Sequence, residues 1–255
     1  MTLEIVTIPC LADNYAFLLN DDETGFTALV DAPEETPILQ ALADRGWSLD
    51  MVLLTHHHWD HVDGLAGILA AHKAQVVGAR ADAHRLPALD VSVAEGDAIQ
   101  IGSMAASIFD VSGHTLGHIA IYIPAAKAVF TADSLMALGC GRLFEGDPAV
   151  MWESLQKLMA LPQDTFVYSG HEYTTANGKF ALTIEPGNPD LIARIEAVKT
   201  ARAAGQPTVP SSLAEEMATN PFLRGHIPEV QASVGLKGAD AGAVFARVRQ
   251  AKDSF

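Results

Sequence analysis

A short histidine-rich stretch, Thr55-His56-His57-His58-Trp59-Asp60-His61, carries the side chains in this sequence that are best suited to chemistry. Imidazole nitrogens and carboxylate oxygens are ligands for Zn, Fe and Mn. Four such groups packed so closely cannot easily all face one ion, but they can serve two adjacent ions. A polar, His-rich turn is the alternative, and we favour metal binding because short His-dense tracts usually have that role. The candidate ligands are His56, His58, Asp60 and His61.

Three later segments each place one more residue of a ligand type at the end of an apolar run. His114 follows residues 108–113, Asp133 follows 128–132, and His171 follows 165–170. In sheet-based proteins, sites gather at one end of the strands, so these side chains can converge. Each signal is weak alone, because a single histidine after glycine is usually an ordinary loop residue. Together with the first cluster they predict a centre for two metal ions.

This pattern resembles the signature of the metallo-β-lactamase superfamily, which is His-x-His-x-Asp-His followed by a distant His, Asp and His. Four further stretches resemble the glyoxalase II branch, the hydroxyacylglutathione hydrolases, and the resemblance extends from the first strand to nearly the last residue. Two positions depart from the family pattern: Ala132 stands where relatives often have glycine, and Phe144 where many have an aromatic hydroxyl near the glutathione. The four stretches are Gly139–Gly146, Gly170–Thr174, Thr219–Arg224 and Arg249–Asp253.

The resemblance also implies a ligand set and a reaction. One ion takes His56, His58 and His114, the other takes Asp60, His61 and His171, and Asp133 bridges the two. Zinc is the favoured metal, with iron or manganese as alternatives. Asp60 and Asp133 are then the catalytic carboxylates, acting with a metal-bound hydroxide that forms because the ions lower the pKa of water towards ~7. A purely structural site is disfavoured, because structural zinc sites are usually single and Cys-rich.

The expected substrate is a glutathione thioester. A thiol has a pKa of ~8.5, so a thiolate leaves without a strong general acid, and the motifs contain no spare acid. The reaction implied is hydrolysis of S-(2-hydroxyacyl)glutathione, typically S-D-lactoylglutathione, to glutathione and D-lactate, the second step of methylglyoxal detoxification. Arg249 and Lys252 share a helix face and could bind a glutathione carboxylate or merely complement the helix end. The expected substrate-binding residues are Arg142, Phe144, Tyr173, Arg249 and Lys252.

Composition and charge argue against several other classes of protein. A net charge of −15 disfavours nucleic acid, which needs clustered Lys and Arg. The N-terminal residues show no secretory signal. No apolar run is long enough to span a bilayer. The two cysteines, Cys10 and Cys140, fit no thiolate zinc spacing. We therefore expect a cytoplasmic monomer that acts on a small molecule. A persulfide dioxygenase, a lactonase, a β-lactamase, a nuclease or a non-catalytic metal-dependent binding protein are the alternatives. A dioxygenase needs a single ion, so Asp60 and His171 would be superfluous.

The elements that must position these residues form an α+β fold in two parts. The resemblance implies an αββα sandwich, residues 1–170, followed by a helical substrate-binding domain, residues 171–255. Apolar runs predict strands over 3–8, 15–19, 26–31, 51–55, 75–79, 98–101, 105–111, 119–123, 128–131 and 166–168. Helical spacing and breakers predict helices over 34–45, 64–72, 149–161, 190–203 and 241–252, and Ser212 with Glu215 predicts a capped helix start.

Overall fold

The computed structural model describes residues 2–255, and its internal contacts gather in two compact units. The first unit comprises the chain up to Asp110 together with Leu116–Phe130. The second comprises Val111–Thr115 and Thr131–Phe255. These units divide the chain at other points than the domain boundary expected after residue 170, which stays a prediction.

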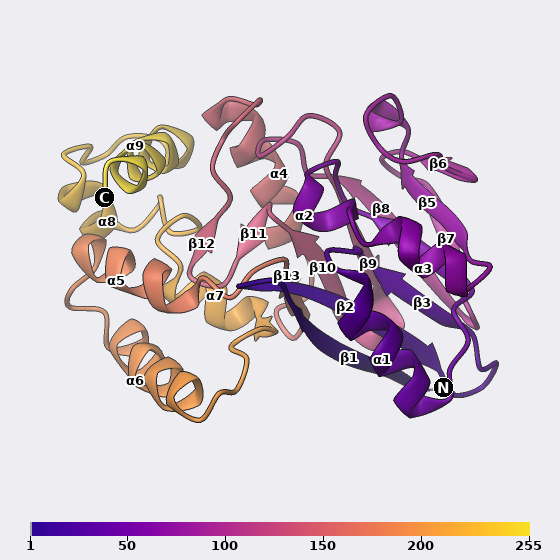
Figure 1. Cartoon of the computed structure of the whole chain (residues 1–255). Helices are drawn as coiled ribbons and strands as arrows, with labels where there is room; N and C mark the ends of the chain where they lie inside the picture. Colours follow the sequence, from indigo (N-terminus) through magenta and orange to yellow (C-terminus); the bar gives the residue numbers. More distant parts are fainter. Residues whose placement is uncertain (1) are drawn as a thin grey trace. The chain divides into compact units, whose positions relative to one another are not determined.

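The first unit contains a six-stranded sheet whose strands follow one another in chain order (Figure 1). The first three strands are antiparallel, and the later ones run parallel. The strands in the middle of the sheet are buried along nearly their whole length, which is typical of strands covered on both faces. They are β1 (Leu3–Cys10), β2 (Asn14–Asp21), β3 (Thr27–Val30), β4 (Met51–Leu54), β5 (Gln75–Ala79) and β6 (Val91–Val93).

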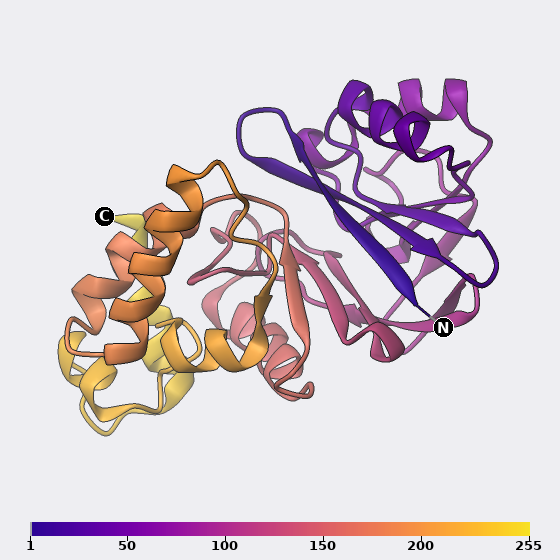
Figure 2. The same cartoon turned by 90° about the horizontal axis from the view of Figure 1, so that it is seen from below.

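Two helices accompany this sheet: α1 (Glu35–Arg45) and α3 (Leu65–Ala71). They pack against each other, and α1 also packs against β1 (Figure 2). Gly46 ends α1 in the left-handed conformation, φ 66°, as its position in the sequence predicts. The remaining short helices of the first unit are α2 (Trp59–Val62) and the 3-10 turns Arg80–Asp82 and Pro124–Ala126.

The second sheet has the strand order β14-β13-β10-β9-β8-β7, and its β7–β10 part is an antiparallel meander. Within the first unit the two sheets meet through their apolar faces, and the rings of Phe17 on β2 and Phe130 on β10 lie 5.5 Å apart. The strands are β7 (Ala98–Ile101), β8 (Met104–Asp110), β9 (Ile119–Ile123), β10 (Ala128–Ala132), β13 (Phe166–Ser169) and β14 (Ser211–Ser212).

The second unit is mainly helical and also holds a short hairpin, β11 (Leu135–Met136) with β12 (Gly139–Cys140). Helix α5 packs on α6, and α4 packs on α9, where the rings of Trp152 and Phe245 lie 5.7 Å apart. The Ser212 hydroxyl accepts a hydrogen bond from the Glu215 amide at 3.1 Å, which confirms the predicted cap of α7. The helices are α4 (Pro148–Met159), α5 (Thr174–Ile184), α6 (Pro189–Ala203), α7 (Leu213–Thr219), α8 (Pro228–Ser233) and α9 (Ala241–Asp253).

Every strand and helix predicted by residue range has a counterpart whose ends agree within two residues. The expectation that strands stop after His171 is wrong in one detail, because Ser211 and Ser212 form β14 and pair with β13. Two serines carry no apolar pattern, so this strand leaves no trace in the sequence. The short elements β6, α2, α8 and the β11–β12 hairpin were likewise not predicted, and the bounds of α5 were not predicted either.

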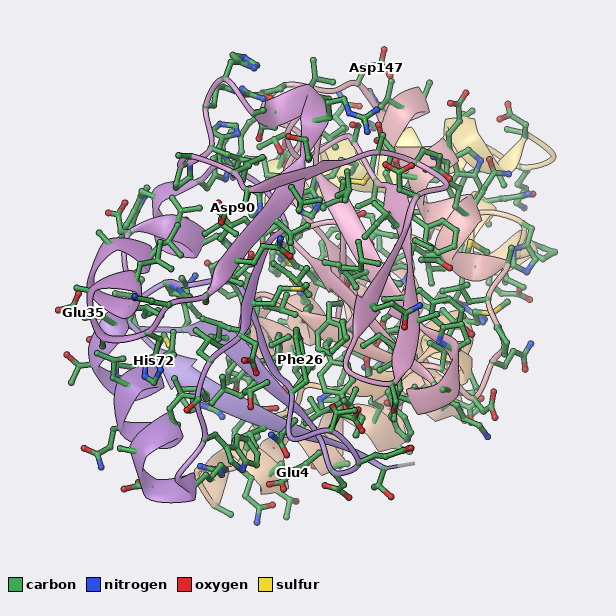
Figure 3. All side chains as sticks on the ribbon, turned by 90° about the vertical axis from the view of Figure 1, so that its right-hand side faces the viewer. Glu4, Phe26, Glu35, His72, Asp90 and Asp147 are labelled. Carbon is green, nitrogen blue, oxygen red and sulfur yellow. The ribbon has the colours of Figure 1, made fainter. Side chains whose placement is uncertain are left out.

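Exposed carboxylates reflect the net charge of −15, and Glu4, Glu35, Asp90 and Asp147 are examples (Figure 3). Figure 3 also labels His72, which belongs to no motif. This half-buried residue ends α3 and accepts a hydrogen bond from the Leu49 amide at 3.4 Å, an ordinary structural role. Among the described residues, no helix combines the length and the apolar character that crossing a membrane requires.

Candidate metal centre

A buried aspartate that no motif singled out holds the histidine-rich turn after β4. Asp31 follows β3 with a φ of 58°, and β3 lies beside β4. Its carboxylate accepts hydrogen bonds from the Thr55 amide at 2.9 Å and the Thr55 hydroxyl at 2.8 Å. It also contacts Nδ1 of His61 at 2.8 Å. Since an ionised carboxylate only accepts, Nδ1 of His61 carries the proton, and Nε2 keeps the lone pair that a metal ion needs.

The imidazole rings of the turn lie close together in the first unit. The ring of His56 lies 4.7 Å from that of His58 and 4.2 Å from that of His61, measured between centroids. His118 stacks on His56 at 4.6 Å with an angle of 17° between the rings. The ring of His118 therefore packs directly on that of a candidate ligand.

The other two members of the turn have partners of their own. The Asn14 amide nitrogen donates to the Asp60 carboxylate at 3.1 Å and to the Asp60 carbonyl at 2.9 Å. His57 contacts the fully buried Asp82 at 2.9 Å, and Arg85 lies on the other oxygen of that carboxylate at 2.5 Å. Asn14 thus fixes a candidate ligand, whereas His57 joins a separate ion-pair cluster.

In the second unit, Asp133 lies between two histidines. Its Oδ2 atom is 3.4 Å from Nε2 of His114 and 3.3 Å from Nε2 of His171. Nδ1 of His114 donates to the main-chain carbonyl of Arg142 at 2.7 Å, so its Nε2 is again the nitrogen with the lone pair. The Asp133 carboxylate thus lies almost equally close to two candidate ligand nitrogens.

The backbone around Asp133 is tightly constrained. The preceding residue, Ala132, has a φ of 40°, and its carbonyl accepts a hydrogen bond from the Gly170 amide at 3.0 Å, next to His171. Gly141 packs on the other side, where an added Cβ would lie 1.9 Å from the Asp133 carbonyl oxygen. Only glycine fits there, because real Cβ atoms do not approach so closely.

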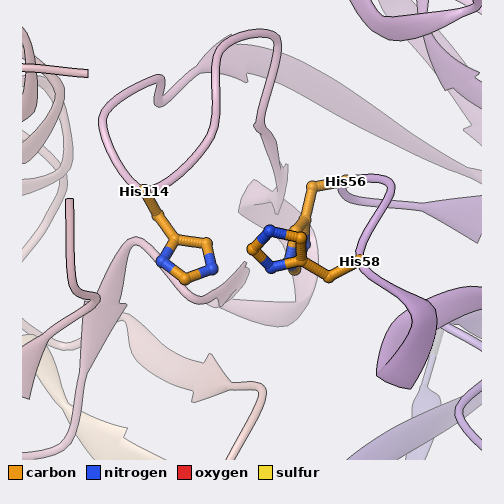
Figure 4. Close-up of side chains that lie close together, drawn as sticks. All are labelled: His56, His58 and His114. Carbon is orange, nitrogen blue, oxygen red and sulfur yellow. The ribbon is translucent and has the colours of Figure 1, made fainter. Parts of the chain in front are cut away.

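The ligand-type atoms form three groups, in each of which all atoms lie within 4.8 Å of one another. Figure 4 labels the members of the first group, with His56 and His58 on the turn after β4 and His114 on a separate loop. The first and third groups have the same members as the two ligand sets expected from sequence, without Asp133. The groups are His56, His58 and His114; His56, His61 and Asp133; and Asp60, His61 and His171.

The donor set suits divalent metal ions. It contains imidazole nitrogens and carboxylate oxygens and no sulfur, and most of its members are buried. Such mixed N/O sets bind zinc, iron and manganese, whereas Cys-rich sets are typical of structural zinc.

Two family models together cover nearly the whole chain. Residues 15–171 match the metallo-β-lactamase superfamily, and residues 172–255 match the hydroxyacylglutathione hydrolase C-terminus. A hydroxyacylglutathione hydrolase of Jannaschia sp. is 63% identical over 99% of this chain and 98% of its own length. That of Ruegeria pomeroyi is 60% identical over the full length of both chains. The chain belongs to the hydroxyacylglutathione hydrolase family.

Solved structures agree with this assignment at the level of the fold. The B3 metallo-β-lactamase BLEG-1 superposes with a TM-score of 0.68 at 20% identity, over 87% of this chain and 100% of that one. The protein TTHA1623, crystallised in a di-iron-bound form, gives a TM-score of 0.63 at 25% identity, over 86% and 100%. The αββα sandwich with a helical C-terminal part, expected from the sequence, is confirmed for this hydroxyacylglutathione hydrolase family member.

Two of the three expected substrate-binding cations lie close to one carboxylate of the second unit. Arg249 donates to Asp253 at 2.8 Å, and Arg142 lies 3.7 Å from the same oxygen. Lys252 is half-buried between the rings of Phe180 and Phe255, and burial, with the neighbouring Arg249, lowers its pKa. Arg249 itself is only 5% exposed and donates to the Cys140 carbonyl at 2.9 Å, so it also has a structural role.

The two expected aromatic residues of the substrate site each contact a candidate ligand. The ring of Tyr173 stacks on that of His171 at 4.6 Å, and the ring of Phe144 meets His114 edge-on at 5.3 Å. Both remain exposed, Tyr173 by 38% and Phe144 by 61%. They are thus accessible to a ligand beside the histidines.

Proposed function

We propose that this protein hydrolyses S-(2-hydroxyacyl)glutathione, typically S-D-lactoylglutathione, to glutathione and D-lactate. Its full-length relatives carry the name hydroxyacylglutathione hydrolase. The observation that carries the chemistry is the place of the Asp133 carboxylate between His114 and His171, within a set of nitrogen and oxygen donors. This is the donor arrangement of a two-ion hydrolytic centre.

Seven side chains would hold the ions. His56, His58 and His114 would bind one, and Asp60, His61 and His171 the other, with Asp133 shared between them. Two ions bound there would supply Lewis acidity for the thioester carbonyl and a nucleophile from water at neutral pH. The di-iron form of TTHA1623 supports two ions per chain for this fold. Zinc is the favoured metal, and iron or manganese fit the same donors.

The chain's own residues orient these ligands. Asp31 keeps Nε2 of His61 deprotonated, and the Arg142 carbonyl does the same for His114. Such outer partners typically change metal affinity or activity by about 10–100-fold when they are lost. Asn14 fixes the Asp60 carboxylate from the side. The leaving thiolate needs no general acid, which accords with a set of side chains that would all serve as metal ligands.

A cluster of cations supports the choice of glutathione. Glutathione carries carboxylates, and Arg142, Arg249 and Lys252 concentrate positive charge in a protein with a net charge of −15. The side chains of Phe144 and Tyr173 would line the same site. Phe144 has no hydroxyl, so one hydrogen bond to the peptide that many relatives could make is missing here.

Thiol release from S-D-lactoylglutathione, measured together with metal content, tests the function. Metal-loaded protein should release glutathione with about two ions per chain, and Asp133→Ala should lower the rate at least ~1,000-fold. Asp22→Ala, which removes an exposed carboxylate, is the matched control and should keep the wild-type rate. Metal-loaded protein that released no thiol would refute the proposal, and a fully active protein with one ion would refute the two-ion centre.

Steady-state kinetics test the substrate site. Arg142→Ala leaves the main-chain carbonyl that holds His114, so the loss of the guanidinium should raise KM about tenfold or more while kcat stays near wild type. Arg249→Ala and Lys252→Ala should also raise KM, the lysine change more weakly. Arg247→Ala, an exposed position on the same helix, is the control. An equal rise in KM for a small thioester without glutathione would show that these cations do not bind the peptide.

A further inference from the structure

The β11–β12 hairpin of the second unit is held by side chains from other elements. Its two strands have only two residues each, and such a hairpin is marginal by itself. Asn177 donates to the Ala137 carbonyl at 3.0 Å, and Asn220 donates to the carbonyls of Met136 at 3.1 Å and Gly139 at 3.0 Å. The amide of Leu138 donates to the Glu216 carboxylate at 2.9 Å. The turn therefore takes its conformation from its surroundings.

Both ends of this hairpin reach the candidate metal ligands. Asp133 lies two residues before β11, and the amide of Gly141, just after β12, donates to the Ser134 carbonyl at 3.0 Å. Gly141 packs directly on the backbone of Asp133. The next residue, Arg142, supplies the carbonyl that orients His114 at 2.7 Å. A shift of the hairpin would thus move one ligand through the chain and another through a hydrogen bond.

Glu216 on α7 lies at the centre of the contacts that hold the turn. Its side chain is fully buried, and every described contact of its carboxylate is to a donor. One oxygen accepts from Leu138 and from Asn220, the latter at 3.0 Å. The other accepts from the Ser211 hydroxyl at 2.5 Å and pairs with Arg194, which is itself 6% exposed.

A buried ion pair contributes little stability compared with apolar residues of the same size, because desolvation offsets the attraction. What it does provide is a single defined geometry when all its acceptors are filled. The carboxylate of Glu216 bonds the backbone of the turn directly and orients Asn220, which bonds two more of the turn's carbonyl groups. Its geometry is therefore transmitted to the hairpin.

We propose that Glu216 is a positioning residue for the metal centre, which sets the ligands Asp133 and His114 through the β11–β12 hairpin. This inference rests on the proposed function, because it assumes that these two side chains bind metal. Asn220 acts in the same way, as the side chain that fixes the carbonyl groups on both sides of the turn.

The test compares metal binding by wild-type protein with that by Glu216→Gln. The glutamine side chain has one oxygen that accepts and one nitrogen that donates. If its oxygen accepts from Leu138, its nitrogen faces the donor Arg194, and the reverse holds in the other orientation. One set of contacts is therefore lost. We expect zinc affinity, measured by competition with a chromophoric chelator, to fall about tenfold. The absorption spectrum of the cobalt(II)-substituted protein should change as well, because it reports ligand geometry.

Two control variants separate positioning from charge and from stability. Glu215→Gln removes the same charge from the same helix, but the Glu215 side chain is exposed and lies 3.5 Å from Arg194. Zinc affinity should therefore stay within about twofold of wild type, and the cobalt spectrum should be unchanged. Ile38→Ala, in the core of α1 in the first unit, should lower the melting temperature and leave the cobalt spectrum unchanged.

Asn220→Ala decides the question if Glu216→Gln does not fold, and it should weaken zinc binding in the same direction. Variants that lose thermal stability like Ile38→Ala but keep wild-type zinc affinity and cobalt spectrum would overturn the positioning role. Wild-type protein that bound no metal would overturn the proposed function and this inference with it.

Discussion

At the scale of single residues, Ala132 is a strained position next to the candidate ligand Asp133. Its φ of 40° lies in the left-handed region, which costs a non-glycine residue about 1–2 kcal/mol. The conformation is needed because the Ala132 carbonyl bonds Gly170 while the next residue turns its carboxylate toward His114 and His171. The methyl group at this position therefore matters through backbone conformation.

Ala132→Gly should make the protein more stable. Glycine adopts positive φ without strain but loses more freedom on folding, about 0.5–1 kcal/mol, so the net gain is of the order of 0.5–1 kcal/mol. The melting temperature should rise by about 1–4 °C. Differential scanning calorimetry of both proteins measures this, and a lower melting temperature for the glycine variant would show that the buried methyl group outweighs the strain.

Residue types and their positions at strand ends were enough to predict which side chains are ligand candidates. Asp31 was missed although it follows the apolar run Ala28–Val30, the same pattern that indicated Asp133. The carbonyl of Arg142 could not be found in this way, because a main-chain group has no signature in sequence. The burial of Arg249 depends on how α9 packs, which an i, i+3 pair of cations does not reveal.

At the scale of elements, Asp21 joins the end of β2 to the turn between β7 and β8. Its carboxylate accepts from the Thr24 hydroxyl and from the Ser103 amide, each at 2.7 Å. These hydrogen bonds, that from Thr24 first, lower the pKa of Asp21 from 3.8 to about 2. The two sheets of the first unit are thus connected by a carboxylate whose ionised form these hydrogen bonds favour.

The contribution of Asp21 to the free energy of unfolding should depend on pH in a defined window. A lowered pKa in the folded state gives stability that is complete above the unfolded pKa of 3.8 and is lost as pH falls through about 2. The difference in unfolding free energy between wild type and Asp21→Asn should therefore be constant above about pH 5 and shrink towards pH 2. Urea titrations at several pH values measure it, with the exposed Asp22→Asn as control. A difference that stayed constant down to pH 2 would refute the assignment.

The long periodic elements were predictable, and the shortest were not. Apolar alternation or helical spacing extends over enough residues in β2, α4 or α9 to identify them. The β11–β12 hairpin is different, because its conformation comes from Asn177, Glu216 and Asn220, which lie far away in the chain. No local pattern can report contacts of that kind.

At the scale of the whole molecule, folding and metal binding should be coupled, because ligands come from widely separated parts of the chain. An ion present at 100 times its dissociation constant stabilises the folded state by about 2.7 kcal/mol. Removing metal with a chelator should therefore lower the melting temperature by about 5–10 °C. The melting temperature of Asp133→Ala should respond less to the chelator. A wild-type melting temperature that did not change would contradict metal binding by the folded chain.

The contacts of the β11–β12 hairpin also have a consequence for hydrogen exchange. The amide hydrogen of a two-residue hairpin turn ordinarily exchanges with water within seconds to minutes, because such turns open locally. The Leu138 amide instead points at the buried Glu216 carboxylate, so it can exchange only when the hairpin separates from α7. Deuterium uptake at Leu138 should then be as slow as in the core of α6, and far slower than at Gly235 in an exposed turn. One of the smallest elements of this protein would thus open as rarely as its largest helices.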